Sequence, residues 1–396
     1  MEKRFLSKRY CVDTETVMGQ AAGLAGNYDD VINLSLGDPD IITPLPIIEQ
    51  AFEDAKAGYT KYTDCRGYKE LREEIAKYYK EEFGMQVSDE EIMVTASGCI
   101  AMYLALEAIL DDGDEVIVPT PYFTIYKTQI ELARGKIVEL DTFEEEHWQI
   151  DPDRLESCIT PKTKVIIINS PNNPTGSCLS PDTMNKIAKV AQKHDLVVIS
   201  DEIYTIYSFA QKFIPFSSLE GMKERTITIN SFSKNFVMTG WRLGMVIAPP
   251  HIVNTIKNIN ENLVYSAPSI SQRAALKALR CREEVQPQLI ETFRERVYYA
   301  AERINQIPNM HVIYPPMGSF YLFINIKDTG LSSVEAAREI FEKAHVVMIP
   351  GNGFGRCGEG FLRIACTVDV SELKEAFDRI EKMDIFKRQA EARVYN

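Results

Sequence analysis

The chain has 396 residues, of which 45% are hydrophobic and 26% charged, as is typical of a folded globular protein. Its formal net charge is −13 and no long basic run occurs, so nucleic acids and anionic membranes are poor partner candidates. The length exceeds what one hydrophobic core usually serves, which predicts at least two domains.

The eight cysteines form no Cys-x-x-Cys pair, and the five histidines are equally dispersed. This pattern argues against disulfides and against a metal site. The basic N-terminal segment lacks the apolar stretch of a signal peptide, and no segment reaches the roughly 18 consecutive apolar residues that a spanning helix needs. We therefore expect a cytoplasmic protein without a bound metal.

The N-terminal segment shows little periodicity and is predicted to be an arm with a short helix near 16–24. An apolar strand follows from Val31 and runs into a Gly/Asp/Pro loop. The spacing of apolar residues then predicts two helices, over 46–57 and 70–83.

From Glu91 the pattern becomes regular, because short Val- and Ile-rich runs alternate with helical stretches. Continuous apolar strands separated by helices indicate a mostly parallel sheet that helices cover on both faces. The seven strands are predicted at 92–95, 115–118, 136–140, 165–169, 196–200, 226–230 and 243–247. We therefore expect a large α/β domain.

The remaining chain mixes helices and strands into a smaller α+β domain. Helices are predicted over 251–281, 291–307, 333–344 and 371–383, and strands over 312–314, 320–326 and 361–366. We expect three parts: an N-terminal arm (1–45) that joins the small domain, a large domain (46–285) and a small C-terminal domain (286–396).

Ligands bind beyond the carboxyl ends of the strands in an open parallel sheet, because the loops there face one crevice. After the first of these strands, Gly98 opens an apolar helix; its neighbouring amides could approach a phosphate, or the glycine could simply allow close packing. After the second, Phe123 could stack on a flat ring or fill the core.

Two further strand ends carry polar side chains. Asn173 lies in the turn Ser-Pro-Asn-Asn-Pro-Thr-Gly, which could aim an amide at a ligand or serve as turn chemistry alone. Asp201 ends a buried strand, where a carboxylate needs a cation such as a protonated pyridine nitrogen. If the chain turns helically, Tyr204 shares its face; the alternative is that Asp201 caps the next helix.

The fifth strand end leads into Ser231-Phe232-Ser233-Lys234, with Arg242 shortly after. A lysine condenses with carbonyl groups, and hydroxyls with an arginine suit a phosphate. In isolation, this stretch could be a serine-rich turn with a solvated lysine. Together, the five strand ends favour a lysine joined to pyridoxal 5′-phosphate.

With these motifs the chain closely resembles the class I and II aminotransferases, pyridoxal-phosphate enzymes of the aspartate aminotransferase fold. The resemblance runs from about Asn33 to the last helix and rests on Asn-Asn-Pro-Thr-Gly, Asp-x-x-Tyr, Ser-x-Ser-Lys and Gly-x-Arg-x-Gly. It implies that Lys234 carries the imine link, that Asp201 pairs with the ring nitrogen, and that Tyr204 and Asn173 bond the ring oxygen.

The resemblance also assigns the remaining contacts. The phosphate would be held by Ser231, Ser233, Arg242 and the amides near Gly98 and Cys99, with Phe123 stacked on the ring. Tyr62 would reach the phosphate of a neighbouring subunit, which implies a homodimer. Arg363 would grip the substrate α-carboxylate, beside Gly37 and Asn173.

Two positions depart from the family pattern. Ser97 stands where many members have glycine, and Cys99 stands where aspartate-preferring members often have a lysine for the distal carboxylate. Residues 261–272 contain no Lys or Arg, whereas Tyr62, Phe123 and Tyr265 are aromatic. This composition favours aromatic or large neutral amino acids as substrates.

The expected activity is therefore transfer of an amino group from such an L-amino acid to a 2-oxo acid, with Lys234, Asp201 and Tyr204 as catalytic residues. Three alternatives remain open: an aspartate or dicarboxylate aminotransferase, a carbon-sulfur lyase of the same fold, and a cofactor-sensing regulator. Release of pyruvate and ammonia from cystathionine would identify the lyase. The acidic charge and the short segment before the first motif argue against a regulator.

Overall fold

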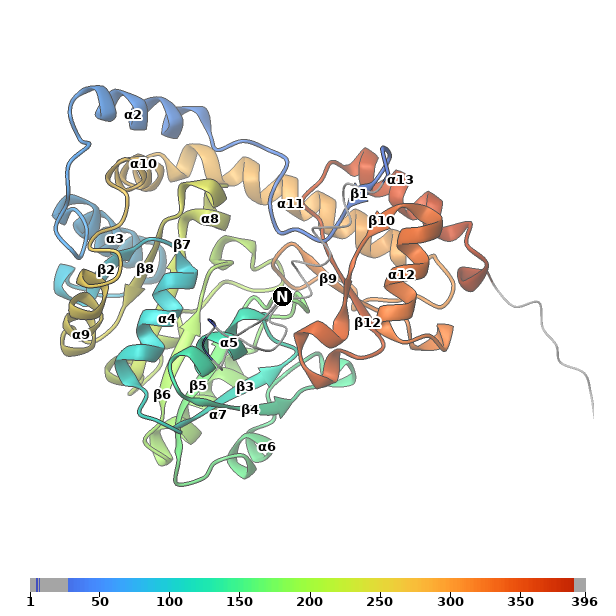
Figure 1. The fold of residues 1–396 in the computed structure, drawn as a ribbon, viewed down its shortest axis with the longest axis horizontal. Helices are drawn as coiled ribbons and strands as arrows, with labels where there is room; N and C mark the ends of the chain where they lie inside the picture. The colour runs from blue at the N-terminus through green and yellow to red at the C-terminus, as the bar shows by residue number, and fades with distance from the viewer. Residues whose placement is uncertain (1–4, 6, 8–27, 388–396) are drawn as a thin grey trace, which may run out of the picture.

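The computed structural model describes residues 5, 7 and 28–387, and its central feature is a seven-stranded sheet, here called the large sheet (Figure 1). Its strands are β2 (Ile92–Thr95), β3 (Glu115–Thr120), β4 (Lys136–Asp141), β5 (Thr163–Asn169), β6 (Val197–Asp201), β7 (Thr226–Ser231) and β8 (Gly244–Ile247). They lie in the order β2-β8-β7-β6-β5-β3-β4, and β8 runs antiparallel to both neighbours. All seven predicted strands are confirmed, with ends that differ by at most two residues.

Helices cover both faces of the large sheet. They are α2 (Leu45–Lys56), α3 (Lys69–Phe83), α4 (Gly98–Ile109), α5 (Ile125–Leu132), α6 (Pro152–Ser157), α7 (Pro181–Lys193), α8 (Phe232–Asn235), α9 (Pro250–Glu261) and α10 (Ser269–Arg280). On β5, Ile167 packs in the core with α4 and α5, whereas Ile166 packs with α6 and α7. Because both faces are buried, the strands read as continuous apolar runs.

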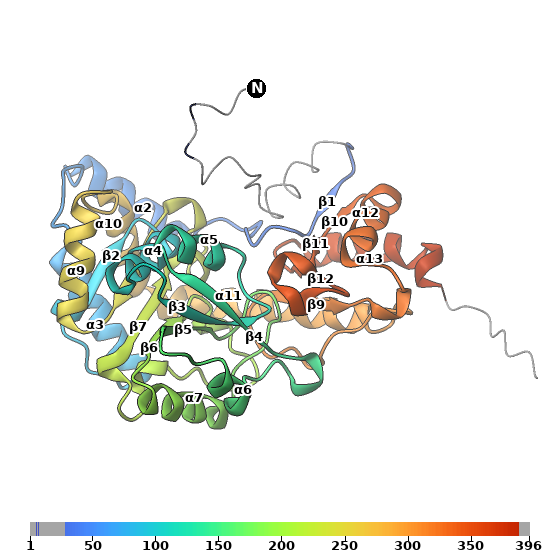
Figure 2. The ribbon, with the colours of Figure 1, turned by 60° about the horizontal axis from the view of Figure 1, so that its bottom comes forward.

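A second sheet organises the C-terminal part. It is antiparallel, in the order β11 (Ile349–Pro350), β12 (Phe361–Ala365), β9 (Tyr321–Asn325). Three helices pack on it: α11 (Arg282–Ile304), α12 (Ser333–Ala344) and α13 (Val370–Glu381). In a separate parallel pair, β1 (Ile32–Asn33) lies beside β10 (Val346–Val347), so the N-terminal strand sits among C-terminal elements (Figure 2).

Helix α11 connects the two parts. Near its start, Val285 packs against the core that α3 and α10 form with the edge of the large sheet. Further along, Leu289 and Phe293 belong to the core of the C-terminal part. The same helix therefore contributes to a hydrophobic core in each part.

Three sequence predictions are wrong. The helix predicted over 251–281 is two helices, because residues 262–268 leave helical geometry: Tyr265 has φ +69° and Pro268 precedes α10. Helix α11 starts nine residues before the predicted 291 and contains Pro287 near its N-terminal end. The strand predicted over 312–314 is absent, and nearby only His311 bridges to Asn325.

The helix predicted near 16–24 lies outside the described residues. Within the described residues, none of the helices combines the length and apolar character needed to cross a bilayer.

Candidate active site

One pocket of about 180 Å³ opens at the carboxyl ends of the large-sheet strands. Its lining includes every residue predicted for the cofactor except Tyr62, and two of the three predicted for the substrate. The lining residues are Gly37, Ser97, Gly98, Cys99, Phe123, Tyr126, Asn169, Asn173, Asp201, Ile203, Tyr204, Ser231, Ser233, Lys234, Thr239, Arg242 and Tyr321.

Asp201 is the last residue of β6, and its side chain is buried with only 4% exposure. The phenolic hydroxyl of Tyr126 donates a hydrogen bond to Oδ2, and the amide of Ile203 donates to Oδ1 at 3.3 Å. Burial raises the pKa of Asp201 to about 6, although the bond from Tyr126 opposes the shift. A cation beside this carboxylate would therefore be strongly favoured.

Lys234 lies in α8, a single helical turn that follows β7 directly. The Ser231 hydroxyl caps this turn by accepting a hydrogen bond from the Ser233 amide at 3.1 Å. The Lys234 ammonium donates to the carbonyl of Gly37 at 2.5 Å, and it lies 5.7 Å from the Phe320 ring centroid. The strand end thus holds the lysine at the pocket, against the N-terminal segment.

The N-terminus of α4 and the Ser231–Ser233 turn also line the pocket. Ser97 caps α4 by accepting from the amide of Ile100 at 3.2 Å. A Cβ atom on Gly244 would lie 2.5 Å from the Gly98 nitrogen, so only glycine lets β8 approach this loop. The Ser231 hydroxyl donates to Ser233 Oγ at 2.9 Å.

Arg242 lines the same pocket. It adopts left-handed backbone angles, φ 53° and ψ 59°, and its Nη1 donates to the carbonyl of Thr239 at 2.7 Å. Helix-terminal amides, two hydroxyls and a guanidinium therefore surround one space, and this donor set is suited to a phosphate.

Tyr204, Asn173 and Arg363 meet at the side that faces the C-terminal sheet. The Tyr204 hydroxyl donates to the Tyr321 hydroxyl at 3.4 Å. Arg363 is fully buried in β12; its Nη1 donates to Asn173 Oδ1 at 3.3 Å and its Nη2 to the carbonyl of Ser35. Burial lowers the pKa of Arg363. The arginine does not itself line the pocket, but Asn173 and Tyr321 connect it to the lining.

Tyr62 lies away from the pocket of its own chain. Its side chain is 86% exposed, and its ring packs edge-on against Tyr265 with centroids 5.1 Å apart. Phe123 lines the pocket and packs edge-on against Tyr126 at 5.8 Å.

Several lining residues were not predicted. Tyr126 lies inside α5 rather than directly after a strand, and Tyr321 begins β9, far along the chain. The sequence pattern could have indicated Asn169, because this residue ends β5 just as Asp201 ends β6. Asn169 Nδ2 donates a hydrogen bond to the carbonyl of Asp201 at 3.0 Å. Thr239 binds Asp38 Oδ1 through its hydroxyl at 2.6 Å.

Comparison with known proteins gives a consistent result. The family described as aminotransferase class I and II matches residues 29–380. The chain is 37% identical to an aspartate aminotransferase of Pyrococcus horikoshii, over 96% of this chain and 97% of that protein. It is 40% identical to aromatic-amino-acid aminotransferase 2 of Thermococcus litoralis, over 91% and 93% respectively. The solved aromatic aminotransferase of Pyrococcus horikoshii superposes with a TM-score of 0.86 at 38% identity, covering 91% of this chain and 97% of that one.

Proposed function

Because the chain belongs to the class I and II aminotransferases, it is a transaminase, and we propose that its preferred amino donors are L-amino acids with aromatic or large neutral side chains. The acceptors are 2-oxo acids, and the cofactor is pyridoxal 5′-phosphate. The single observation that carries the substrate class is the charge of the pocket lining.

Three features of the pocket support this cofactor. The buried Asp201 carboxylate accepts hydrogen bonds from two neutral donors, the Tyr126 hydroxyl and the Ile203 amide, and would pair with a protonated ring nitrogen. Lys234 lines the same space and has an amine to offer to the aldehyde. The donor set around Ser231, Ser233 and Arg242 matches a phosphate. The residues present therefore fit the group.

The cofactor, when bound, supplies an aldehyde that condenses with amines and a ring that withdraws electrons from the adjacent carbon. Asp201 would hold a proton on the ring nitrogen. Lys234 Nζ would hold the cofactor through its aldehyde and would act as general base for the substrate α-proton. Arg363 and Asn173 would orient the substrate carboxylate, and Tyr204 would donate a hydrogen bond to the ring oxygen.

The pocket contains few charges for a second carboxylate. Among the described residues that line it, the only Lys or Arg side chains are Lys234 and Arg242, and both already have roles. Arg356 lies outside the lining and is bound to Asp141, at 2.6 Å from Nε to Oδ1. An unpaired buried carboxylate costs about 2 kcal/mol, or roughly thirtyfold in affinity. A neutral or aromatic side chain avoids this cost.

Stopped-flow half-reactions with the loaded enzyme test the substrate class. Phenylalanine, tyrosine, leucine and methionine should convert the cofactor to its amine form faster than aspartate does. A higher rate constant with aspartate would overturn the substrate assignment and point to a cation that enters the pocket from elsewhere.

Trapping with borohydride tests the cofactor site. Reduction of the loaded enzyme should fix the cofactor on Lys234, and Lys234→Ala should fold and bind the cofactor without forming a reducible link. A trapped cofactor on any other lysine would contradict the assignment.

We also propose that the enzyme is a homodimer in which Tyr62 reaches the neighbouring site. Large apolar side chains are exposed in two stretches of the chain, which meet where Tyr62 packs against Tyr265, and a second copy would bury them: Ile42, Leu45, Phe52, Tyr62, Leu263 and Tyr265. Mixing Lys234→Ala subunits with Tyr62→Phe subunits should restore activity, because each mixed dimer would contain one intact site. Failure of the mixture to exceed either variant alone would contradict the exchange of Tyr62.

The division into an N-terminal arm (1–45), a large domain (46–285) and a small domain (286–396) is part of the same proposal. The pairing of β1 with β10 supports the assignment of the arm to the small domain. We place the enzyme in the cytoplasm; among the described residues, all seven cysteines are free thiols, as a reducing compartment would maintain them.

A further inference from the structure

Tyr321 contacts two side chains to which the proposed function gives roles, Tyr204 and Arg363. We propose that Tyr321 is a positioning residue with two separable tasks: its hydroxyl sets the hydrogen bond that Tyr204 gives to the cofactor, and its ring holds the Arg363 guanidinium in place for the substrate carboxylate. This inference rests on the proposed function and deepens it.

The hydroxyl of Tyr321 lies in a confined space beside the pocket, between Tyr204 and Gly37. Tyr321 is 3% exposed and Tyr204 is 5% exposed, and their hydroxyl oxygens lie 3.4 Å apart. A Cβ atom on Gly37 would lie 1.9 Å from the Tyr321 oxygen, so the glycine leaves space for this hydroxyl and for nothing larger. The position of the oxygen is therefore fixed from both sides.

The direction of the hydrogen bond between Tyr204 and Tyr321 determines how strongly Tyr204 can bind a ring oxygen. A phenolic hydroxyl has one hydrogen to donate, and in the structure Tyr204 is the hydrogen-bond donor to Tyr321. When Tyr204 donates to a ring oxygen instead, Tyr321 becomes the donor to Tyr204. A donated hydrogen bond polarises the Tyr204 O–H group and strengthens the bond that Tyr204 makes. In the structure, where Tyr204 is the donor, burial and the neighbouring Tyr321 hold the pKa of Tyr204 well above its usual value, and a hydrogen bond donated by Tyr321 would act in the opposite direction.

The ring of Tyr321 serves the second task. The guanidinium carbon of Arg363 lies 4.7 Å from the Tyr321 ring centroid and 5.1 Å from that of Phe354. In the sheet, Tyr321 pairs with Ala365 and Phe323 pairs with Arg363. The small Ala365 leaves the diagonal space between Tyr321 and Arg363 open, which lets the guanidinium lie over the ring.

Tyr321→Phe and Tyr321→Leu separate the two tasks in the loaded enzyme. Spectrophotometric titration should show that Tyr321→Phe raises the pKa of the lysine–cofactor link by about half a unit or more, because Tyr204 stabilises the ring oxygen less. Calorimetry on the cofactor-free protein should show that Tyr321→Phe binds 3-phenylpropanoate and maleate like the wild type, whereas Tyr321→Leu binds both about tenfold more weakly.

Phe354→Leu is the matched control, since it removes a ring from Arg363 without touching Tyr204. It should weaken binding of the two carboxylates and leave the pKa of the link unchanged. An unchanged pKa in Tyr321→Phe overturns the first task, and equal carboxylate affinity in Tyr321→Phe and Tyr321→Leu, both folded by near-ultraviolet circular dichroism, overturns the second. If the wild type bound maleate more tightly than 3-phenylpropanoate, this would contradict the proposed substrate class but not the role of Tyr321. The role of Tyr321 is tested by the ratio of affinities between variants for the same carboxylate.

Discussion

Ser97 adopts backbone angles of φ 131° and ψ 162°, a region that is essentially reserved for glycine. Ser97 directly precedes α4, whose first residues line the pocket. Glycine adopts these backbone angles without strain, which explains why many family members have glycine at this position. The residue carries strain of about 1–3 kcal/mol. The cap that its hydroxyl provides to Ile100 offsets part of this strain.

Ser97→Gly should therefore stabilise the protein by about 1 kcal/mol, since relief of strain exceeds the few tenths lost with the cap and the added entropy of the unfolded chain. Urea unfolding measures the change. Ser97→Ala is the control: it keeps the strain, loses the cap, and should be less stable than the wild type. A Ser97→Gly variant that is less stable than the wild type would mean that the cap dominates.

Asp201 and Glu202 are adjacent acids, and both are buried. Glu202 is 1% exposed, and its Oε1 accepts from Ser200 Oγ at 2.9 Å and from the Phe216 amide at 3.0 Å. Burial raises the pKa of Glu202 to about 7 and that of Asp201 to about 6. The folded protein without cofactor thus holds protons that the unfolded chain releases at lower pH.

Because these pKa values are raised on folding, their stabilising contribution is complete below the unfolded values of about 4 and is lost as the pH rises through about 6 and about 7. The cofactor-free protein should lose up to about 3 kcal/mol per group between pH 4 and pH 8. Asp201→Asn and Glu202→Gln should each flatten part of this slope in urea unfolding. Added pyridoxal phosphate should remove only the part of the pH dependence that comes from Asp201. A wild-type free energy of unfolding that does not change between pH 4 and pH 8 would contradict both pKa shifts.

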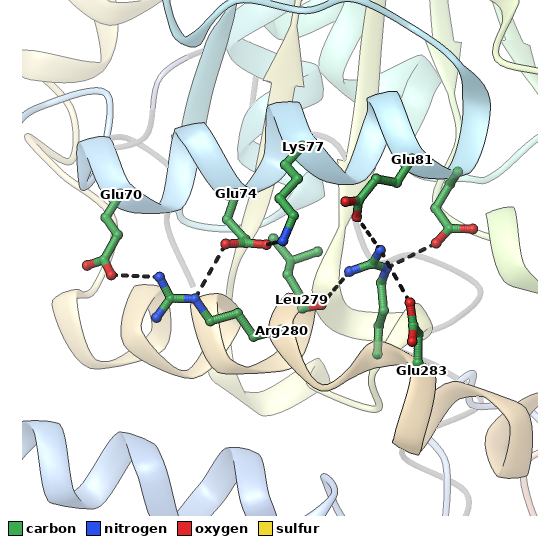
Figure 3. Close-up of polar contacts among 9 residues, drawn as sticks. Glu70, Glu74, Lys77, Glu81, Leu279, Arg280 and Glu283 are labelled. Atoms are coloured by element: carbon green, nitrogen blue, oxygen red, sulfur yellow. Dashed lines mark hydrogen bonds and ion pairs between the residues drawn. The ribbon is translucent and has the colours of Figure 1, made fainter.

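At the scale of elements, α3 and α10 are joined by a ladder of ion pairs that continues into α11 (Figure 3). Arg280 binds Glu70 at 2.7 Å and Glu74 at 3.4 Å. Arg282 binds Glu81 at 2.6 Å and Glu82 at 3.0 Å, and it also donates to the carbonyl of Leu279 at 3.0 Å. The two arginines differ in burial, with side-chain exposures of 47% and 8% respectively.

Arg282→Ala should lower the free energy of unfolding by about 2–3 kcal/mol, because it removes a buried cation and leaves a carbonyl and two carboxylates without their donor. Arg280→Ala, the exposed counterpart, should change it by less than about 1 kcal/mol and less still in high salt. The free energy of unfolding is measured in urea, because guanidinium chloride is a salt and would screen the ion pairs. Equal losses of stability in the two variants would contradict the role assigned to burial.

The sequence predicts elements best where the pattern is local. The seven strands are continuous apolar runs with clear ends, and the helix at 333–344 matches α12 at both ends. Strands β10 and β11 have two residues each, too short for any period to show. The contacts of Tyr126 with Asp201 and of Tyr321 with Tyr204 join residues 75 and 117 positions apart, and no local pattern marks them. Roles that follow from folding over such distances need the structure.

At the scale of the molecule, the segment from β1 to α2 links both parts to the pocket. Ser35 contacts Arg363, and Gly37 contacts Lys234. The segment is held to α11 by Arg296, whose Nη1 and Nη2 bind Asp40 at 2.7 and 3.1 Å. This ion pair therefore supports two proposed functional groups at once.

Arg296→Met should lower stability by about 2 kcal/mol and raise the KM for amino-acid donors, because the segment that contacts Lys234 and Arg363 is released. Arg303→Met is the control: Arg303 ties α11 to Asp378 and Glu381, away from the pocket. It should lower stability without changing KM. Steady-state kinetics with both variants distinguishes the two effects, and an unchanged KM in Arg296→Met would contradict the link.

The contact between Ser35 and Arg363 also fixes an order of events during synthesis. The two residues are 328 positions apart, and a ribosome adding roughly 5–20 residues per second needs about 16–65 s to cover that distance. Just before Val346 is added, β1 still has no β10 to pair with, although every strand of the large sheet has by then left the ribosome's active site. A nascent chain that stops before β10 thus contains every strand of the large sheet but lacks Arg363, to which the proposed function assigns the substrate carboxylate.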